Sequence, residues 1–261
     1  MEKNKMKLYP IKTKIIKPGE DIIKIILNTL EETSLPLKNN DILVLAESAV
    51  ATSQNRIVKL SSIKPSEKAL KLSQKYKLDP RLAELILQEA DVILGGVEHV
   101  LLTIKDKTFQ ANAGIDKSNV PEGCVTLLPL NPTETAEKIR RRIYKTLNVK
   151  IGVIIADSRT QPLRLGNVGM AVGVAGFKPV KDERGHRDLF NKPLRITRRA
   201  IADNLASAAE VLMGEADESI PAVLIRGAPV EFTDEKIPPD QTYIPPNECL
   251  YVSVFKENLR L

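Results

Sequence analysis

Alternation of apolar runs with amphipathic segments divides the chain into short strands and helices. Two runs of aliphatic and β-branched residues, over 41–46 and 151–156, predict strands that are buried on both faces. Apolar positions recur at helical spacing over 21–29 and 132–147, which predicts amphipathic helices. Both kinds of secondary structure are therefore expected along the whole chain.

Cap signals define the starts of two helices. Asp79 followed by Pro80 is typical of a helix N-terminus, because the carboxylate caps the first turn and proline suits the first helical position. Asn131, with Glu134 three residues later, predicts a capped start for the helix over 132–147.

Turn signals and β-branched residues suggest further strands. Gly95 and Gly96 predict a tight connection between strands over 92–94 and 99–104. After a proline-rich stretch, the residues 250–255 predict a final short strand.

The buried run over 151–156 leads directly into Asp157 and Ser158, and three spaced glycines follow. Burying a carboxylate without partners costs roughly several kcal/mol, so Asp157 is expected to meet a cation, a metal or a set of backbone donors. A structural aspartate that caps a turn is the alternative. Gly169, Gly173 and Gly176 predict positive φ or close approach of another group to the backbone.

Cysteine and histidine usage limits the metal chemistry. The 261 residues include two cysteines, Cys124 and Cys249, without a Cys-x-x-Cys spacing, and two histidines. Neither a disulfide framework nor a zinc site is therefore expected. Any metal would have oxygen ligands, which favours Mg²⁺ or Mn²⁺.

The net charge of +6 is compatible with nucleic acid or with small anionic substrates. The densest basic cluster, over 138–145, falls within a predicted helix, so we interpret it as a solvated helix face. Aromatic residues are scarce and tryptophan is absent, which argues against a base-stacking surface. With no long apolar run and no signal-peptide pattern, a cytoplasmic protein without nucleic-acid or membrane partners is expected.

Three acidic residues, Asp116, Asp157 and Glu215, each occur near glycine and small residues after an ordered element. If they converge, their mutual repulsion requires a divalent cation, and such a site suits phosphoryl transfer. Spacing alone does not show that they converge. Asp116 and Asn119 can equally form an Asx-turn, which the spacing slightly favours.

Several motifs occur in a fixed order along the chain, at 112–119, 154–158, 164–166, 171–176, 187–189, 212–215 and 225–227. Together they resemble the F420-0:γ-glutamyl ligase family. The resemblance implies a two-lobed α+β fold with mixed sheets that dimerises. The catalytic unit is expected over 1–230, followed by a Pro-rich C-terminal extension over 231–261.

The resemblance implies a GTP-dependent ligase that attaches L-glutamate to the carboxylate of coenzyme F420-0 and extends a γ-glutamyl tail. It implies Mg²⁺ or Mn²⁺, with K⁺ as a further ion. A carboxylate oxygen is a poor leaving group, so transfer of the γ-phosphoryl group to it, giving an acyl phosphate, makes the attack of an amine feasible. These expectations set the roles of individual residues.

Residue roles follow from the matched motifs. The implied metal ligands are Asp116, Asp157, Ser158 and Glu215, and Asp157 is also the implied catalytic residue. Arg164 is our candidate for stabilising the transferring phosphoryl group. The implied nucleotide contacts are Thr13, Lys14, Ile15, Ile16, Glu47, Ser48, Asn119, Met213, Gly214, Ala216, Asp217, Glu218, Ser219 and Ile220.

Two departures from the family pattern bear on specificity. Thr52 stands where the family has a nucleotide-contacting lysine, and 157–161 departs from the common Asp-Thr-x-Gly-Arg, although Arg159 can restore a positive charge. Two alternatives therefore stay open. One is the same reaction on another acceptor, such as a folate-like pterin, and the other is a paralogue that binds nucleotide or cofactor without turnover.

Overall fold

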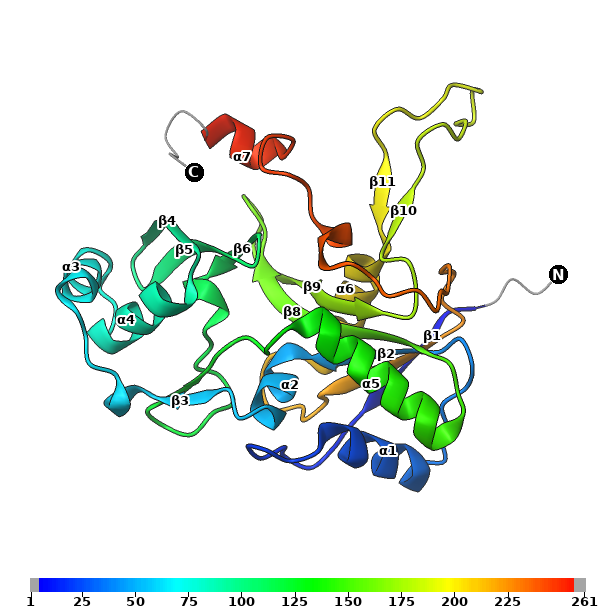
Figure 1. The fold of residues 1–261 in the computed structure, drawn as a ribbon, viewed down its shortest axis with the longest axis horizontal. Coiled ribbons are helices and arrows are strands. Elements are labelled where there is room, and N and C mark those ends of the chain that lie inside the picture. The colour runs from blue at the N-terminus through cyan, green and yellow to red at the C-terminus, as the bar shows by residue number, and fades with distance from the viewer. Residues whose placement is uncertain (1–4, 256–261) are drawn as a thin grey trace. The chain divides into compact units, whose positions relative to one another are not determined.

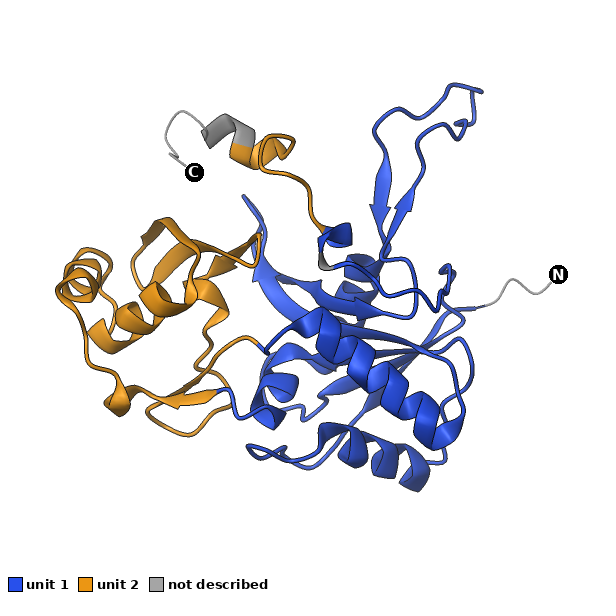
Figure 2. Ribbon diagram, viewed as in Figure 1, with its two compact units in different colours: residues 1–56, 129–242 blue, residues 57–128, 243–261 orange. Residues whose placement is uncertain are grey.

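The computed structural model describes residues 5–255, which form two compact units (Figure 2). Unit 1 comprises residues 1–56 and 129–242, and unit 2 comprises 57–128 and 243–261. The combination of helices with several sheets confirms that the fold is mixed α and β. The end of the expected C-terminal extension, 256–261, lies outside the described residues, and the expected division at residue 230 stays a prediction.

Unit 1 is built on a five-stranded mixed sheet with the strand order β1-β12-β2-β8-β9. Only β2 and β8 pair in parallel, and every other neighbouring pair is antiparallel. The two predicted buried strands are therefore adjacent in the sheet. The strands are β1 (Lys7–Ile11), β2 (Ile42–Ala46), β8 (Gly152–Thr160), β9 (Asn167–Ala175) and β12 (Ala222–Arg226).

Helices cover both faces of this sheet (Figure 1). Leu43 and Leu45 of β2 pack in the cluster that contains α1 (Ile22–Glu32) and α5 (Pro132–Leu147). The alternate residues of β2 pack instead against α6 (Ile201–Met213). Because successive side chains of a strand point to opposite faces, a strand with helices on both sides is apolar throughout.

Ion pairs within unit 1 neutralise much of the basic cluster on α5. Asp21 caps α1 by accepting from the Lys24 N–H at 3.1 Å, and it also accepts from Arg142 Nη1 at 2.8 Å. The hydrogen bond from Arg142 lowers the pKa of Asp21. Arg140 and Arg141 both pair with Glu137, at 2.8 and 2.6 Å. This pairing agrees with a helix face rather than a nucleic-acid surface.

Asn131 occupies the N-cap position of α5, as predicted, but the expected capping bonds are absent, whereas the cap predicted for α4 (Pro80–Glu89) is confirmed. Asn131 has a φ of 44° and makes no capping bond through its side chain, and Glu134 pairs with Lys138 at 3.0 Å instead. Asp79 does cap α4, because its carboxylate accepts from the Arg81 N–H at 2.8 Å. The Arg81 guanidinium lowers the pKa of Asp79 to about 2.

Unit 2 contains two small antiparallel sheets and short helices. Its three-stranded sheet consists of β4 (Val92–Val97), β5 (Val100–Lys105) and β6 (Thr108–Ala111), and β3 (Ile57–Lys59) pairs with β7 (Cys124–Thr126). The helical elements are α3 (Glu67–Tyr76), α4, α7 (Leu250–Phe255) and the 3₁₀ turns at Leu60–Ser62 and Asn112–Gly114, with a further 3₁₀ turn of unit 1 at Pro239–Thr242.

Two predictions for unit 2 were wrong. Gly95 and Gly96 lie within β4, and the turn falls at Glu98 and His99. Gly96 is needed for close packing, because a Cβ there would lie 2.3 Å from the Val100 carbonyl oxygen. The predicted strand over 250–255 is the helix α7. Among the described residues, no helix combines the length and apolar character that a bilayer span requires.

Candidate functional site

One edge of the unit 1 sheet brings distant segments together. Ile11 of β1 pairs with Ala222 of β12, Ala222 pairs with Leu45 of β2, and Leu45 pairs with Ile155 of β8. The residues that follow β1 and β2 and those that precede β12 therefore meet at the same edge as the last third of β8. This edge is where α/β proteins commonly bind ligands.

Backbone hydrogen bonds join the expected nucleotide segments at this edge. The Thr13 N–H donates to the Ser219 carbonyl at 3.0 Å, which joins 13–16 to the loop 213–220. The Ala46 N–H donates to the Pro221 carbonyl at 2.9 Å, immediately before Glu47 and Ser48 begin α2 (Glu47–Ser53). All the expected nucleotide contacts except Asn119 thus lie at one end of the sheet.

The loop after α6 is shaped by its own residues. Met213 is buried, and Gly214 ends the helix with a φ of 71°. The Glu218 carboxylate accepts from the Ala216 N–H at 2.9 Å and closes a short turn. In the neighbouring segment 13–16, Lys14 forms an ion pair with Glu20 at 2.6 Å.

Acidic side chains cluster where β8 meets the end of α6. Asp157 and Ser158 lie within β8, which runs on to Thr160 rather than ending before them. The Ser158 hydroxyl donates to Glu215 Oε2 at 3.5 Å. Burial, Glu215 and the charge of Asp157 together raise the pKa of Glu210, on α6, to about 7. Two implied metal ligands, Ser158 and Glu215, are therefore in contact, and the charge of Asp157 acts on the same group as that of Glu215.

Contacts with β9 hold α6 in place beside β8. Asp203 accepts from the Ala171 N–H at 2.9 Å, and Ser207 donates to the Gly169 carbonyl at 2.8 Å. A Cβ at Gly169 would lie 2.6 Å from the backbone of Ala206, so glycine permits this close approach, as predicted. These contacts cover the outer edge of β9 and fix the position of Glu210 on α6.

Asp116 and Asn119 belong to unit 2. The Asp116 carboxylate accepts from both the N–H and the hydroxyl of Ser118, each at 3.0 Å, which confirms the Asx-turn. Asn119 is exposed and has a φ of 54°. The convergence of Asp116 with Asp157 and Glu215 stays a prediction.

Arg164 lies in the exposed connection between β8 and β9. Leu163 and Leu165, on either side of it, are fully exposed. Its backbone N–H donates to the Gln161 carbonyl at 3.2 Å. Arg164 thus follows Asp157 of β8 along the chain, in a hairpin connection of unit 1.

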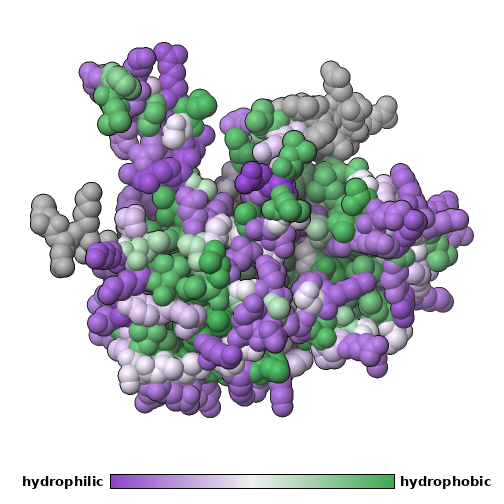
Figure 3. Space-filling view, turned by 180° about the vertical axis from the view of Figure 1, so that it is seen from behind, coloured by the Kyte–Doolittle hydropathy of each residue, from purple (hydrophilic) through white to green (hydrophobic). Residues whose placement is uncertain are grey.

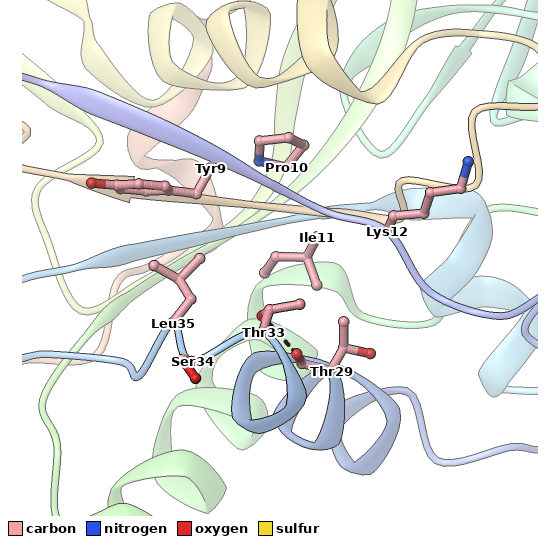
Figure 4. A pocket seen from close by; sticks show the side chains of 8 residues that line it. All are labelled: Tyr9, Pro10, Ile11, Lys12, Thr29, Thr33, Ser34 and Leu35. Carbon is pink, nitrogen blue, oxygen red and sulfur yellow. Dashed lines mark hydrogen bonds between the residues drawn. The ribbon is translucent and has the colours of Figure 1, made fainter.

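A cavity of about 340 Å³ lies beside the Thr13 segment, between β1 and α1 (Figure 4). The Thr33 hydroxyl donates to the Thr29 carbonyl at 2.7 Å, so it is engaged with its own helix. Lys12 points away from Thr33 and Leu35. The residues that line the cavity include no carboxylate, and we do not include it in the site.

Comparisons with known proteins identify the family. Residues 10–227 match the family described as F420-0:Gamma-glutamyl ligase. The chain belongs to this family. It is 43% identical to a coenzyme F420:L-glutamate ligase of Methanothermobacter thermautotrophicus over 82% of this chain and 86% of the relative. Proteins of the same name from Methanocaldococcus jannaschii and Methanosarcina mazei are 40% and 34% identical, over 90% and 95% of this chain and 93% and 94% of theirs.

Membership of the F420-0:γ-glutamyl ligase family makes the protein an enzyme of the ligase class. The oxygen donors of Asp157, Ser158 and Glu215, at this edge of the unit 1 sheet, suit a hard divalent cation. Burial, together with the neighbouring carboxylates of Glu215 and Asp157, raises the pKa of Glu210 to about 7. Within 5–255, however, no three His, Cys, Asp or Glu side chains lie in an arrangement that could hold a metal by themselves.

Glu210 is a site residue that the sequence predictions for this ligase family member missed. It lies in a helix whose buried face is mostly alanine, and it points toward the sheet. The available signal was a carboxylate on the buried stripe of an alanine-rich helix, three residues after Ser207 and seven after Asp203.

Proposed function

We propose that the protein is a GTP- and divalent-metal-dependent ligase that joins L-glutamate to the carboxylate of coenzyme F420-0 and extends a γ-glutamyl tail. The observation that carries this proposal is the meeting of 13–16, 47–48 and 213–220 with Asp157 and Ser158 at one edge of the unit 1 sheet. The names of the relatives supply the substrates.

The reaction needs two steps. The acceptor carboxylate attacks the γ-phosphorus of GTP, and GDP leaves, which gives an acyl phosphate. The amine of L-glutamate then attacks the acyl carbon, loses a proton and expels phosphate, which forms the amide. Placement of the reacting groups and stabilisation of charge supply most of the catalysis in such transfers.

The residues expected to bind the substrates and the metal have distinct roles in this proposal. Asp157, Ser158 and Glu215 would hold Mg²⁺ or Mn²⁺, with K⁺ as a further ion, and the family resemblance also implies Asp116 as a metal ligand. Such cations would offset the charge of the phosphates. The segments 13–16 and 213–220, together with Glu47, Ser48 and Asn119, orient the nucleotide. Arg164 stabilises negative charge on the phosphoryl group or on the acceptor.

Mass spectrometry tests the proposal directly. Pure protein is incubated with GTP, Mn²⁺, L-glutamate and coenzyme F420-0, and we expect products heavier by whole glutamyl units. ATP replaces GTP in a parallel reaction, because Thr52 stands where the family has a lysine. Glutamyl addition only to a folate-like pterin would replace the proposed acceptor, and nucleotide binding without any product would indicate a non-catalytic paralogue.

We also propose that the protein is a homodimer that acts in the cytoplasm. Strands β10 (Val180–Asp182) and β11 (Arg198–Ala200) begin an arm that extends from unit 1 (Figure 1). At its tip, Leu189 and Phe190 are 100% and 83% exposed, and apolar surface is visible on the arm in Figure 3. The Asp188 carboxylate orders this tip by accepting from the Phe190 N–H at 2.8 Å.

An ordered tip with exposed apolar side chains suits burial in a second copy, since each buried side chain contributes about 1.5–3 kcal/mol. We expect sedimentation to give a dimer for the wild type and a monomer for a Leu189→Asp, Phe190→Asp variant. Leu70→Asp changes another exposed leucine, in unit 2, and serves as the control. A monomeric wild type would contradict the dimer.

A further inference from the structure

Arg159 is a charged residue for which the described part of the chain supplies no hydrogen-bond partner. It follows Ser158 on β8 and is half-buried. Its Nε–H is buried, and no hydrogen bond or ion pair joins the guanidinium to any residue within 5–255. Buried polar groups are nearly always hydrogen-bonded, and a charged donor without an acceptor is especially unfavourable. The side chain is therefore suited to receive an acceptor from a ligand.

Asp203 interacts with Arg159 electrostatically, without a hydrogen bond between the two side chains. Burial raises the pKa of Asp203, and the charge of Arg159 lowers it. The Asp203 carboxylate is already engaged, because its Oδ1 accepts from the Ala171 N–H at 2.9 Å. Arg159 thus balances a buried negative charge without being bonded to it, and its N–H groups remain available.

The position of Arg159 in β8 relates it to the acidic site. Residues two apart in a strand project from the same face and lie roughly 7 Å apart. Arg159 therefore shares a face of β8 with Asp157, the central acidic residue of the site. A guanidinium on the same face of a strand as a carboxylate can bind an anionic group placed beside it, and its planar fork matches two phosphate oxygens.

We propose that Arg159 binds a phosphoryl group of a substrate in the site at the edge of the unit 1 sheet. This inference rests on the proposed function. Two substrates carry a phosphoryl group: the nucleoside triphosphate and the acceptor, coenzyme F420-0, through its phosphodiester. In both cases Arg159 donates from its buried Nε and a terminal nitrogen to non-bridging phosphate oxygens.

Calorimetric titration of the full chain distinguishes the two sources. The probes are a non-hydrolysable GTP analogue with Mg²⁺ and, separately, coenzyme F420-0. Arg159→Gln is expected to weaken the affinity for one probe by at least about tenfold, as loss of a charge-assisted pair does. Arg159→Lys is expected to restore part of it. Arg141→Gln removes an exposed arginine that pairs within α5 and should bind both probes like the wild type.

Unchanged affinity of Arg159→Gln for both probes would overturn the inference, as would a wild type that binds neither. A purely structural role predicts a different result. Arg159→Gln would then lower the melting temperature, Asp203→Asn would restore it in the double variant, and both affinities would stay the same. A wild type that binds the GTP analogue through Arg159 but adds no glutamate would contradict the proposed function and leave this inference standing.

Discussion

Asp157 in unit 1 and Asp116 in unit 2 are both implied metal ligands, yet their surroundings differ. Asp116 is held by its near neighbour Ser118, which supplies two hydrogen bonds from two residues away. Asp157 lies within a long strand, and its charge acts on Glu210, a residue 53 positions later (210 minus 157). One carboxylate is therefore placed by its own turn, and the other by the assembly of the sheet with α6.

This difference has a chemical consequence. Asp116 accepts two hydrogen bonds from Ser118, whereas Glu210 lies near two other carboxylates. Burial first, and then Glu215 and Asp157, raise the pKa of Glu210, and like charges gathered in this way favour the binding of a divalent cation. The unit 1 acids are thus the stronger candidates for the main cation contact.

The largest effect is expected from Asp157→Asn. It keeps the side-chain shape but removes the charge, so we expect glutamyl addition to fall by roughly 10³-fold, with an unchanged circular dichroism spectrum. Initial rates of product formation, followed by mass spectrometry, measure this loss. Asp234→Asn changes a surface aspartate that pairs with Lys150 at 2.5 Å and should retain the wild-type rate. Full activity of Asp157→Asn would refute its catalytic assignment.

Asp116→Asn tests whether unit 2 contributes to the same chemistry. We expect Mn²⁺ affinity and turnover to fall by about 10- to 100-fold, a smaller effect than at Asp157. Manganese binding followed by electron paramagnetic resonance provides the measurement. Ser118→Ala removes the hydroxyl partner of Asp116 but keeps its backbone donor, so near-normal affinity is expected. If the asparagine variant binds Mn²⁺ normally, Asp116 is only a turn residue.

Gly169 and Gly123 contrast packing in unit 1 with turn geometry in unit 2. Gly169→Ala places a methyl group against the backbone of α6, so the free energy of unfolding should fall by about 1–3 kcal/mol. Gly123 has a φ of 77° and open space around it, so Gly123→Ala should cost only about 1 kcal/mol through backbone strain. Urea unfolding of both variants gives the comparison. Equal losses would show that α6 is free to move.

The smallest effect concerns the pH dependence of stability in metal-free protein. Folding raises the pKa of Glu210 from 4.5 to about 7, so its contribution is fully present below pH 4.5 and is lost as the pH rises through 7. Glu210→Gln has no carboxyl group to ionise at this position, so it does not lose stability in this way as the pH rises. At pH 8 its free energy of unfolding should exceed that of the wild type by about 1 kcal/mol, after allowance for solvent screening. If Glu210→Gln and the wild type differ in free energy of unfolding by the same amount at pH 4.5 and at pH 8, the raised pKa of Glu210 is contradicted.

Much of the secondary structure could be predicted because local patterns decide it. The buried strands 41–46 and 151–156 and the helices α1 and α4 follow from periodicity and caps. Two predictions in unit 2 were wrong. Gly96 is needed for close strand packing rather than for a turn, and the residues 250–255 form a helix despite their β-branched content.

The sequence by itself determined the strands, the helix ends, the Asx-turn at Asp116 and the family, because each depends on neighbouring residues or on the order of motifs. Only the tertiary structure decided that the segments around Thr13, Glu47 and Ser219 share one edge with Asp157. The physical reason is strand register. Pairing β1 with β12, β12 with β2 and β2 with β8 fixes which distant chain segments meet, and no local pattern encodes that choice.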